Sequence, residues 1–238
     1  MSDKFRPFVL VARMGSPIAM SEPIHLDGIL YDVRFRANPE LRGTPLDCIA
    51  YRDGIPQCSA SIVVAEGLAG AVFGTSVAVR GITARDLSRI GVPPKGLSRI
   101  AEMSPYRNRM RDYPTLSGVD RMMWQVLGDP DAVLRMLSQV PGIGAMRSRG
   151  HGRVSSWEVL DCDADAAEAG WFAGDRILRA LPLSVVDVRR GDRPENGVVG
   201  TPRPNTPFWQ MADAVETMTP SLRGAIMTGR EARQVLSC

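Results

Sequence analysis

The residues best suited to chemistry form a glycine-rich segment at residues 142–152, which reads GIGAMRSRGHG and contains two Gly-x-Gly pairs with five residues between them. Glycine lets a ligand approach the main chain, and successive exposed N–H groups can bind an anion. Arginine binds phosphate through two parallel hydrogen bonds. The segment therefore predicts a site for a polyanion, although a mobile turn between a helix and a strand remains the alternative. The candidate residues are Gly142, Gly144, Arg147, Ser148, Arg149, Gly150, His151, Gly152 and Arg153.

Two common nucleotide-binding motifs do not fit this segment. A P-loop needs a lysine after its second glycine, and residues 142–152 contain no lysine. A Rossmann fingerprint follows a strand and opens a helix, whereas the expected order here is helix, glycine-rich segment, strand. ATP and NAD are therefore disfavoured, and no cofactor is expected.

The chain has only two histidines, His25 and His151, so a mechanism that needs two imidazoles must use both. His25 opens an expected helix, where we favour a contact with the backbone or with the bound polyanion. Asp27 can orient His25, but an acid in the first turn of a helix also suits the helix dipole, and we favour this second role. His151 can stack on a base or contact a phosphate.

The basic residues are almost all arginine. Of 238 residues, 29 are basic and 26 acidic, which gives a net charge of +3, and lysine occurs only at Lys4 and Lys95. A GC-rich genome explains the choice of arginine but not its clustering. Residues 81–118 contain seven basic and three acidic side chains, and their apolar residues follow no sustained helical or strand period. We therefore expect a basic insertion here. If extended, Arg107, Arg109 and Arg111 would lie on one face and could follow a nucleic-acid backbone, although a solvated loop face is equally compatible.

Apolar periodicity predicts an α+β protein with one domain over residues 1–238. We expect a strand at 8–14, a helix at 25–35, paired antiparallel strands at 59–65 and 71–80, and a strand or short helix at 119–127. Asp129 and Pro130 then begin a helix that runs to about residue 140. Strands at 153–160 and 183–188, partly helical segments at 164–170 and 172–181, and a loop at 189–207 complete the prediction. This order fits a ferredoxin-like fold.

Composition excludes several other classes of protein. The four cysteines are scattered without a C-x-x-C pair, so a zinc site is not expected and reduced thiols in a cytoplasm are the default. No stretch approaches the ~18 apolar residues of a membrane span, and the N-terminal residues do not read as a signal peptide. We therefore expect a cytoplasmic prokaryotic protein without bound metal.

The glycine pattern resembles the C-terminal glycine-rich loop of the CRISPR RAMP superfamily, with Ile143 and, as a loose match, His151 in its hydrophobic slots. The flanking sequence is similar to the Csf-three family, the Cas-five-type subunit of type IV effector complexes. This similarity is carried by residues 128–133, 140–144 and Arg147-Ser148, by the opening blocks 16–18 and 23–30, and by late residues 203–204 and 207–209.

The resemblance implies a ferredoxin-like (RRM-like) RAMP fold and a non-catalytic subunit that binds CRISPR guide RNA. Such a subunit caps the repeat-derived five-prime handle, packs on the repeating backbone (Cas-seven-like) subunit near the large subunit, and meets target DNA only indirectly. It would serve antiviral or anti-plasmid defence. A thumb-like insertion often helps to clamp the RNA, and residues 81–118 are the candidate here.

Two rival functions stay open from the sequence. One is a metal-independent, Cas-six-like endoribonuclease that processes CRISPR repeat RNA with His25 as general acid or base. The other is a general RNA-binding module without a CRISPR role.

Overall fold

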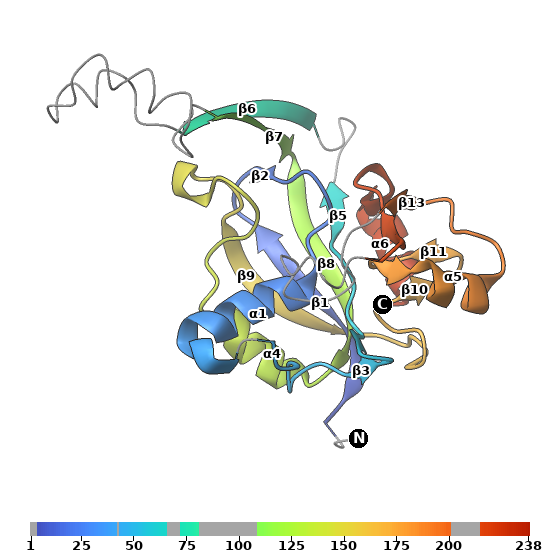
Figure 1. The fold of residues 1–238 in the computed structure, drawn as a ribbon. Coiled ribbons are helices and arrows are strands. Elements are labelled where there is room, and N and C mark those ends of the chain that lie inside the picture. The colour runs from blue at the N-terminus through green and yellow to red at the C-terminus, as the bar shows by residue number, and fades with distance from the viewer. Residues whose placement is uncertain (1–3, 42, 66–71, 81–108, 201–214) are drawn as a thin grey trace, which may run out of the picture.

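The computed structural model describes residues 4–41, 43–65, 72–80, 109–200 and 215–238, with only the main chain described at 72–80 and 109–113. A five-stranded sheet runs through its centre in the order β15-β5-β8-β1-β9 (Figure 1). These strands are β15 (Ile226–Met227), β5 (Ile62–Ala65), β8 (Val119–Gly128), β1 (Arg6–Met14) and β9 (Val154–Asp161). Neighbouring strands are antiparallel, except that β15 runs parallel to β5.

Strand β1 is buried on both faces because its residues alternate between two cores. Phe8 and Leu10 face one core, whereas Val9 and Val11 face the other. Leu10 pairs with Trp124 on β8 and with Val159 on β9. A strand covered on both faces is a continuous apolar run, which explains why FVLVA is predictable as a strand.

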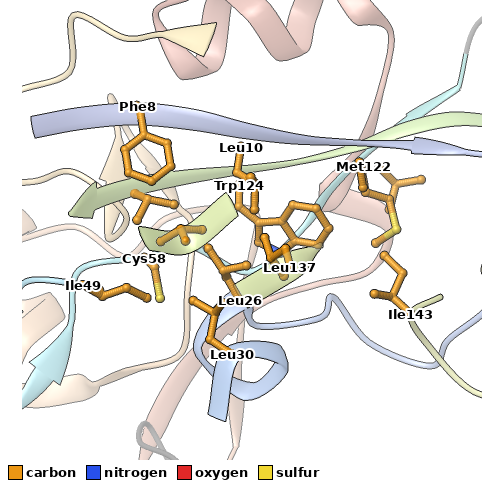
Figure 2. Packing of buried hydrophobic residues seen from close by; sticks show 14 of the residues in the cluster. Phe8, Leu10, Leu26, Leu30, Ile49, Cys58, Met122, Trp124, Leu137 and Ile143 are labelled. Atoms are coloured by element: carbon orange, nitrogen blue, oxygen red, sulfur yellow. The ribbon is translucent and has the colours of Figure 1, made fainter. Parts of the chain in front are cut away.

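Two helices cover the first face of this sheet, α1 (Leu26–Ala37) and α4 (Pro130–Leu137). Figure 2 shows Leu26 and Leu30 of α1 and Leu137 of α4 around Trp124. Helix α4 begins as predicted, because the Oδ1 of Asp129 accepts hydrogen bonds of 3.0 Å from the amides of Asp131 and Ala132. A 3-10 turn, η1 (Pro39–Leu41), follows α1.

The other face carries α6 (Gly229–Leu236) and the C-terminal elements (Figure 1). A small sheet in the order β12-β14-β13 combines β12 (Leu181–Pro182), β14 (Thr217–Pro220) and β13 (Gly197–Gly200), and it packs with α5 (Leu183–Arg190). Two short hairpins pair β3 (Tyr51–Arg52) with β4 (Ile55–Pro56) and β10 (Phe172–Ala173) with β11 (Arg176–Ile177). Further 3-10 turns are η2 (Arg147–Arg149) and η4 (Arg223–Ala225). Among the described residues, no helix is long and apolar enough to cross a membrane.

A third sheet in the order β2-β7-β6 joins β2 (Ile18–Ala19), β7 (Arg109–Ser117) and β6 (Val72–Arg80). Strands β6 and β7 form a long antiparallel pair beyond one end of the central sheet (Figure 1). The prediction of an irregular insertion over 81–118 is therefore wrong for residues 109–117, which are a strand. Residues 81–108 of that prediction lie outside the described residues.

Chain order and sheet order together give the architecture. The elements run β1-α1-β5-β8-α4-β9, while the corresponding strands lie in the order β5-β8-β1-β9, all antiparallel to their neighbours. This mixed α+β arrangement is compatible with the expected ferredoxin-like fold. It also sets the glycine-rich segment in the connection from α4 to β9.

Several predicted elements differ from the observed ones. The segments around 59–65 and 71–80 do not pair with each other, because β5 joins the central sheet and β6 pairs with β7. Residues 119–127 are a strand, one of the two alternatives. The segment 172–181 forms the β10–β11 hairpin rather than a partial helix, and the loop predicted at 189–207 contains β13.

The predicted strand 183–188 is part of helix α5. Its β-branched residues favour a strand locally, but Leu183 and Val186 are buried at helical spacing in the third core, whereas Val188 is 87% exposed. Tertiary packing thus overrides the local preference. Gly191, with φ +69°, ends the helix.

Candidate nucleic-acid interface

The glycine-rich segment closes on itself as a compact loop. Ile143 N donates to the carbonyl of Gly152 at 2.8 Å, and Val154 N donates to that of Pro141 at 2.9 Å. These bonds bring the first Gly-x-Gly pair against the second. Main-chain hydrogen bonds therefore tie the two ends of the loop together.

The closed loop docks on the chain between β1 and β2. Gly152 N donates to Pro17 O at 2.7 Å, and Ala145 N donates to Ala19 O at 2.8 Å. Arg153 N donates to the hydroxyl of Ser16 at 2.9 Å. Since Ala19 also pairs with β7, the glycine-rich loop and the β6–β7 hairpin are anchored on the same short strand.

Two glycines are required by this packing. Gly144 and Gly152 have φ of +80° and +69°. A Cβ on Gly144 would lie 2.8 Å from Ala19 O, and one on Gly152 would overlap Ile143 O. The main-chain N–H groups of Ile143, Ala145 and Gly152 already have partners inside the protein, so an anion nest cannot use them. The spacing of the glycines is therefore explained by the closure of the loop before any role in binding an anion.

The basic residues of the loop lie on its exposed part. Arg147, Ser148 and Arg149 form the exposed turn η2, held by a bond of 3.0 Å from Gly150 N to Arg147 O. Arg147 Nη1 donates to Gly142 O at 3.3 Å, and Arg153 is also exposed at the far side of the loop. Arg147, Arg149 and Arg153 are exposed residues, so a phosphate in solution can reach them.

A groove of about 1650 Å³ lies beside the loop. Its walls come from three parts of the chain: one face of α1 with the turn before it, the glycine-rich loop, and the β13–β14 strands with the turn after them. Five charged residues line it, and Asp32 and Arg36 of α1 form an ion pair of 2.8 Å within it. The charged lining residues are Glu22, Asp32, Arg36, Arg147 and Arg153.

Both histidines line this groove, as do Gly142, Gly144 and Gly150. His25 is partly buried and forms the N-cap of α1 without a side-chain cap bond. Burial, together with the positive charge of Arg179, lowers the pKa of His25 to about 4, while Asp27 acts in the opposite direction. His25 is therefore uncharged at neutral pH, and its lowered pKa suits neither a neutral-pH general acid nor a charged phosphate contact.

Asp27 does lie in the first turn of α1, but its side chain belongs to a buried polar cluster. Arg179 Nη2 lies 3.6 Å from Asp27 Oδ2, and both side chains are fully buried. Arg179 Nη1 also donates to the carbonyl oxygens of Pro56 at 2.7 Å and Cys58 at 2.9 Å. Motif spacing does not predict this cluster. Its one signal in the sequence is a lone arginine in the apolar run ILRALPL.

The predicted arginine strip falls on the β6–β7 hairpin. Register pairs Arg111 with Ala78 and Arg109 with Arg80. Residues two apart share a face of a strand, so the main chain at Arg109 and Arg111 has the extended form that an arginine strip on one face requires. Arg107 lies outside the described residues.

These observations define a mixed α+β protein with a central sheet. Its glycine-rich loop connects α4 to β9 and borders a large groove. The family model of the CRISPR type IV associated protein Csf3 matches residues 80–220, more than half of the chain. The chain therefore belongs to this family, which confirms the resemblance inferred from the glycine pattern. A search of curated proteins found no match.

Proposed function

We propose that this protein is the non-catalytic subunit of a type IV CRISPR effector complex that caps the guide RNA at its repeat-derived five-prime handle. It has a RAMP fold, packs on the repeating backbone subunit near the large subunit, and acts in the prokaryotic cytoplasm. Family membership supports the type IV assignment. The order β5-β8-β1-β9, with the glycine-rich loop between α4 and β9, supports the fold.

The observation that carries RNA binding is the exposed turn of the glycine-rich loop at the edge of the groove. No acidic residue occurs between Ala132 and Trp157, so the arginines of this turn have no acidic neighbours in sequence. Arg147 and Arg153 also line the groove itself. Cations on one rim of a groove suit a phosphate backbone, and arginine contributes planar, bidentate contacts.

The test measures the affinity of the purified protein for a labelled handle RNA across a salt titration. Arg147→Ala should weaken binding and lower the slope of log K against log salt by about 0.7 to 1, because one phosphate contact is lost. Arg230→Ala, an exposed arginine on α6 away from the groove, is the matched control and should leave the slope unchanged. An identical slope for Arg147→Ala and wild type would contradict the proposal.

Preference for the handle separates this function from general RNA binding. The effector role requires the handle to bind more tightly than random RNA of equal length. It also requires the protein to co-purify with guide RNA and a backbone subunit when the three are co-expressed. Equal affinity for both RNAs would favour the general module.

An endoribonuclease remains the second candidate, because His25 and His151 line the same groove. The lowered pKa of His25 disfavours it as a proton donor near neutral pH. Incubation with repeat RNA and EDTA tests this function directly. A defined product that disappears in His25→Ala would replace the proposed role with RNA processing.

A further inference from the structure

We infer that the groove between α1 and the β13–β14 strands binds unpaired nucleobases of the same RNA whose phosphates the glycine-rich loop contacts. The inference rests on the proposed function and adds a base-binding surface that includes the C-terminal strands. Its occupant is a single-stranded RNA segment.

The walls away from the loop carry four apolar side chains beside their charged and polar ones. Helix α1 contributes Ile29 and Val33, β13 contributes Val198, and the turn after β14 contributes Leu222. Val198 is 54% exposed on an edge strand, an unfavourable position for valine unless something covers it. Unpaired bases offer apolar faces that can cover such a surface.

Charge is distributed unevenly around the groove. Arg147 and Arg153 lie on the loop wall, whereas the side of α1 carries the acidic Glu22 and an Arg36 that is already paired with Asp32. A phosphate backbone is therefore attracted to the loop side, which directs its bases toward α1 and β13. A duplex would bury those bases, so the apolar side chains of the walls favour a single strand.

The volume and one aromatic side chain support this occupant. About 1650 Å³ exceeds the roughly 300–1000 Å³ of small-molecule pockets and suits a polymer segment. His151 lines the groove, and an imidazole ring can stack on an unpaired base.

The test uses two adjacent valines of β13. Val198 lines the groove, whereas Val199, on the opposite face of the strand, is 42% exposed and does not line it. Val198→Asp should weaken binding of the handle RNA at least tenfold, because a carboxylate would replace an apolar contact beside an anionic ligand. Val199→Asp should bind within twofold of wild type. Thermal unfolding of both variants checks that the fold is retained.

A second measurement does not depend on substitution. Handle RNA carrying 4-thiouridine, photo-crosslinked to the wild-type protein, should label peptides that contain residues 197–200 or 219–222. Handle RNA with abasic nucleotides should bind wild type and Val198→Asp equally, because the lost contact is to the base. Crosslinks confined to other described elements would overturn the inference.

The outcomes separate the two proposals. If RNA binding depends on Arg147 but Val198→Asp and Val199→Asp bind alike, the base-binding groove is wrong and the proposed function stands. If Val198→Asp leaves RNA binding intact but weakens co-purification with the backbone subunit, the groove binds that subunit and not RNA. The inference is then likewise overturned. If the handle RNA does not bind wild type at all, the proposed function fails first.

Discussion

Arg179 and Asp27 form a fully buried ion pair, with 3.6 Å between Nη2 and Oδ2. Asp27 belongs to α1, and Arg179 lies between β11 and β12, so the pair joins the helical face to the C-terminal elements. Arg179 also holds two carbonyl oxygens of the segment that runs from β4 toward β5. The cluster therefore fixes the position of the segment that carries His25 and borders the groove.

Removing one partner of this pair should be costly. Arg179→Met leaves the Asp27 carboxylate buried without its cation, and should lower the free energy of unfolding by about 3–5 kcal/mol in urea titrations. Arg36→Met, which removes an exposed i,i+4 pair with Asp32, is the control and should cost less than about 0.5 kcal/mol. The double variant Asp27→Leu/Arg179→Met should recover most of the loss. A free energy of unfolding of Arg179→Met equal to that of wild type would show that the ion pair does not stabilise the fold.

The lowered pKa of His25 predicts a pH-dependent stability. In the unfolded chain the pKa of His25 has its ordinary value of 6.5, and in the folded protein it is about 4, so between these values only the unfolded chain binds the proton. Stability should be full above pH 6.5, fall by roughly 2–3 kcal/mol toward pH 4, and level off below it. Urea unfolding from pH 4 to about 7 should show this fall in wild type and a flatter profile in His25→Gln. An NMR titration of His25 with its midpoint near 6.5 would contradict the prediction.

The two positive-φ glycines of the second Gly-x-Gly pair should differ in tolerance. Gly150 has open space where a Cβ would lie, so alanine there meets only the cost of a positive φ, about 1–2 kcal/mol. Gly152→Ala shares that cost and also collides with the Ile143 carbonyl, so it should destabilise the protein by about 2 kcal/mol more. Its RNA affinity should fall as well, since the loop loses its closure. Equal unfolding midpoints for the two variants would argue against a rigid loop.

The four thiols should fall into two classes of reactivity. Cys48 and Cys58 are buried, and burial raises the pKa of Cys48 to about 11 and that of Cys58 well above its ordinary value. Cys162 and Cys238 are partly exposed. Reaction of the native protein with a thiol reagent at about pH 8 should therefore label two cysteines first and all four only on unfolding. Mass spectrometry of the labelled peptides identifies the sites, and early labelling of Cys58 would mean that the Arg179 cluster opens readily.

Local signals in the sequence predicted some elements correctly. Helix α4 follows from Asp129 and Pro130 at its start and from Pro141 and Gly142 after its end. Strand β1 follows from a branched apolar run. The glycine-rich loop was identified from spacing alone, and the family match confirms the class of protein that this spacing indicated.

Elements that depend on distant partners could not be predicted in this way. Strands β5 and β6 are neighbours in sequence, yet β5 pairs with β8 and β6 with β7, so the pairing partner of each strand does not follow from its own residues. Residues 183–188 form a helix because the third core accepts Leu183 and Val186 at helical spacing.

By itself, the sequence determined the character of this protein: an arginine-rich α+β chain with a glycine-rich loop of the CRISPR type. Only the tertiary structure decided why two of the four glycines are indispensable, that His25 is uncharged beside a buried Arg179, and that α1, the loop and β13–β14 share one groove. The physical reason is that glycine spacing and helix caps act within a few residues, whereas burial, ion pairing and groove walls require residues up to about 200 positions apart to meet.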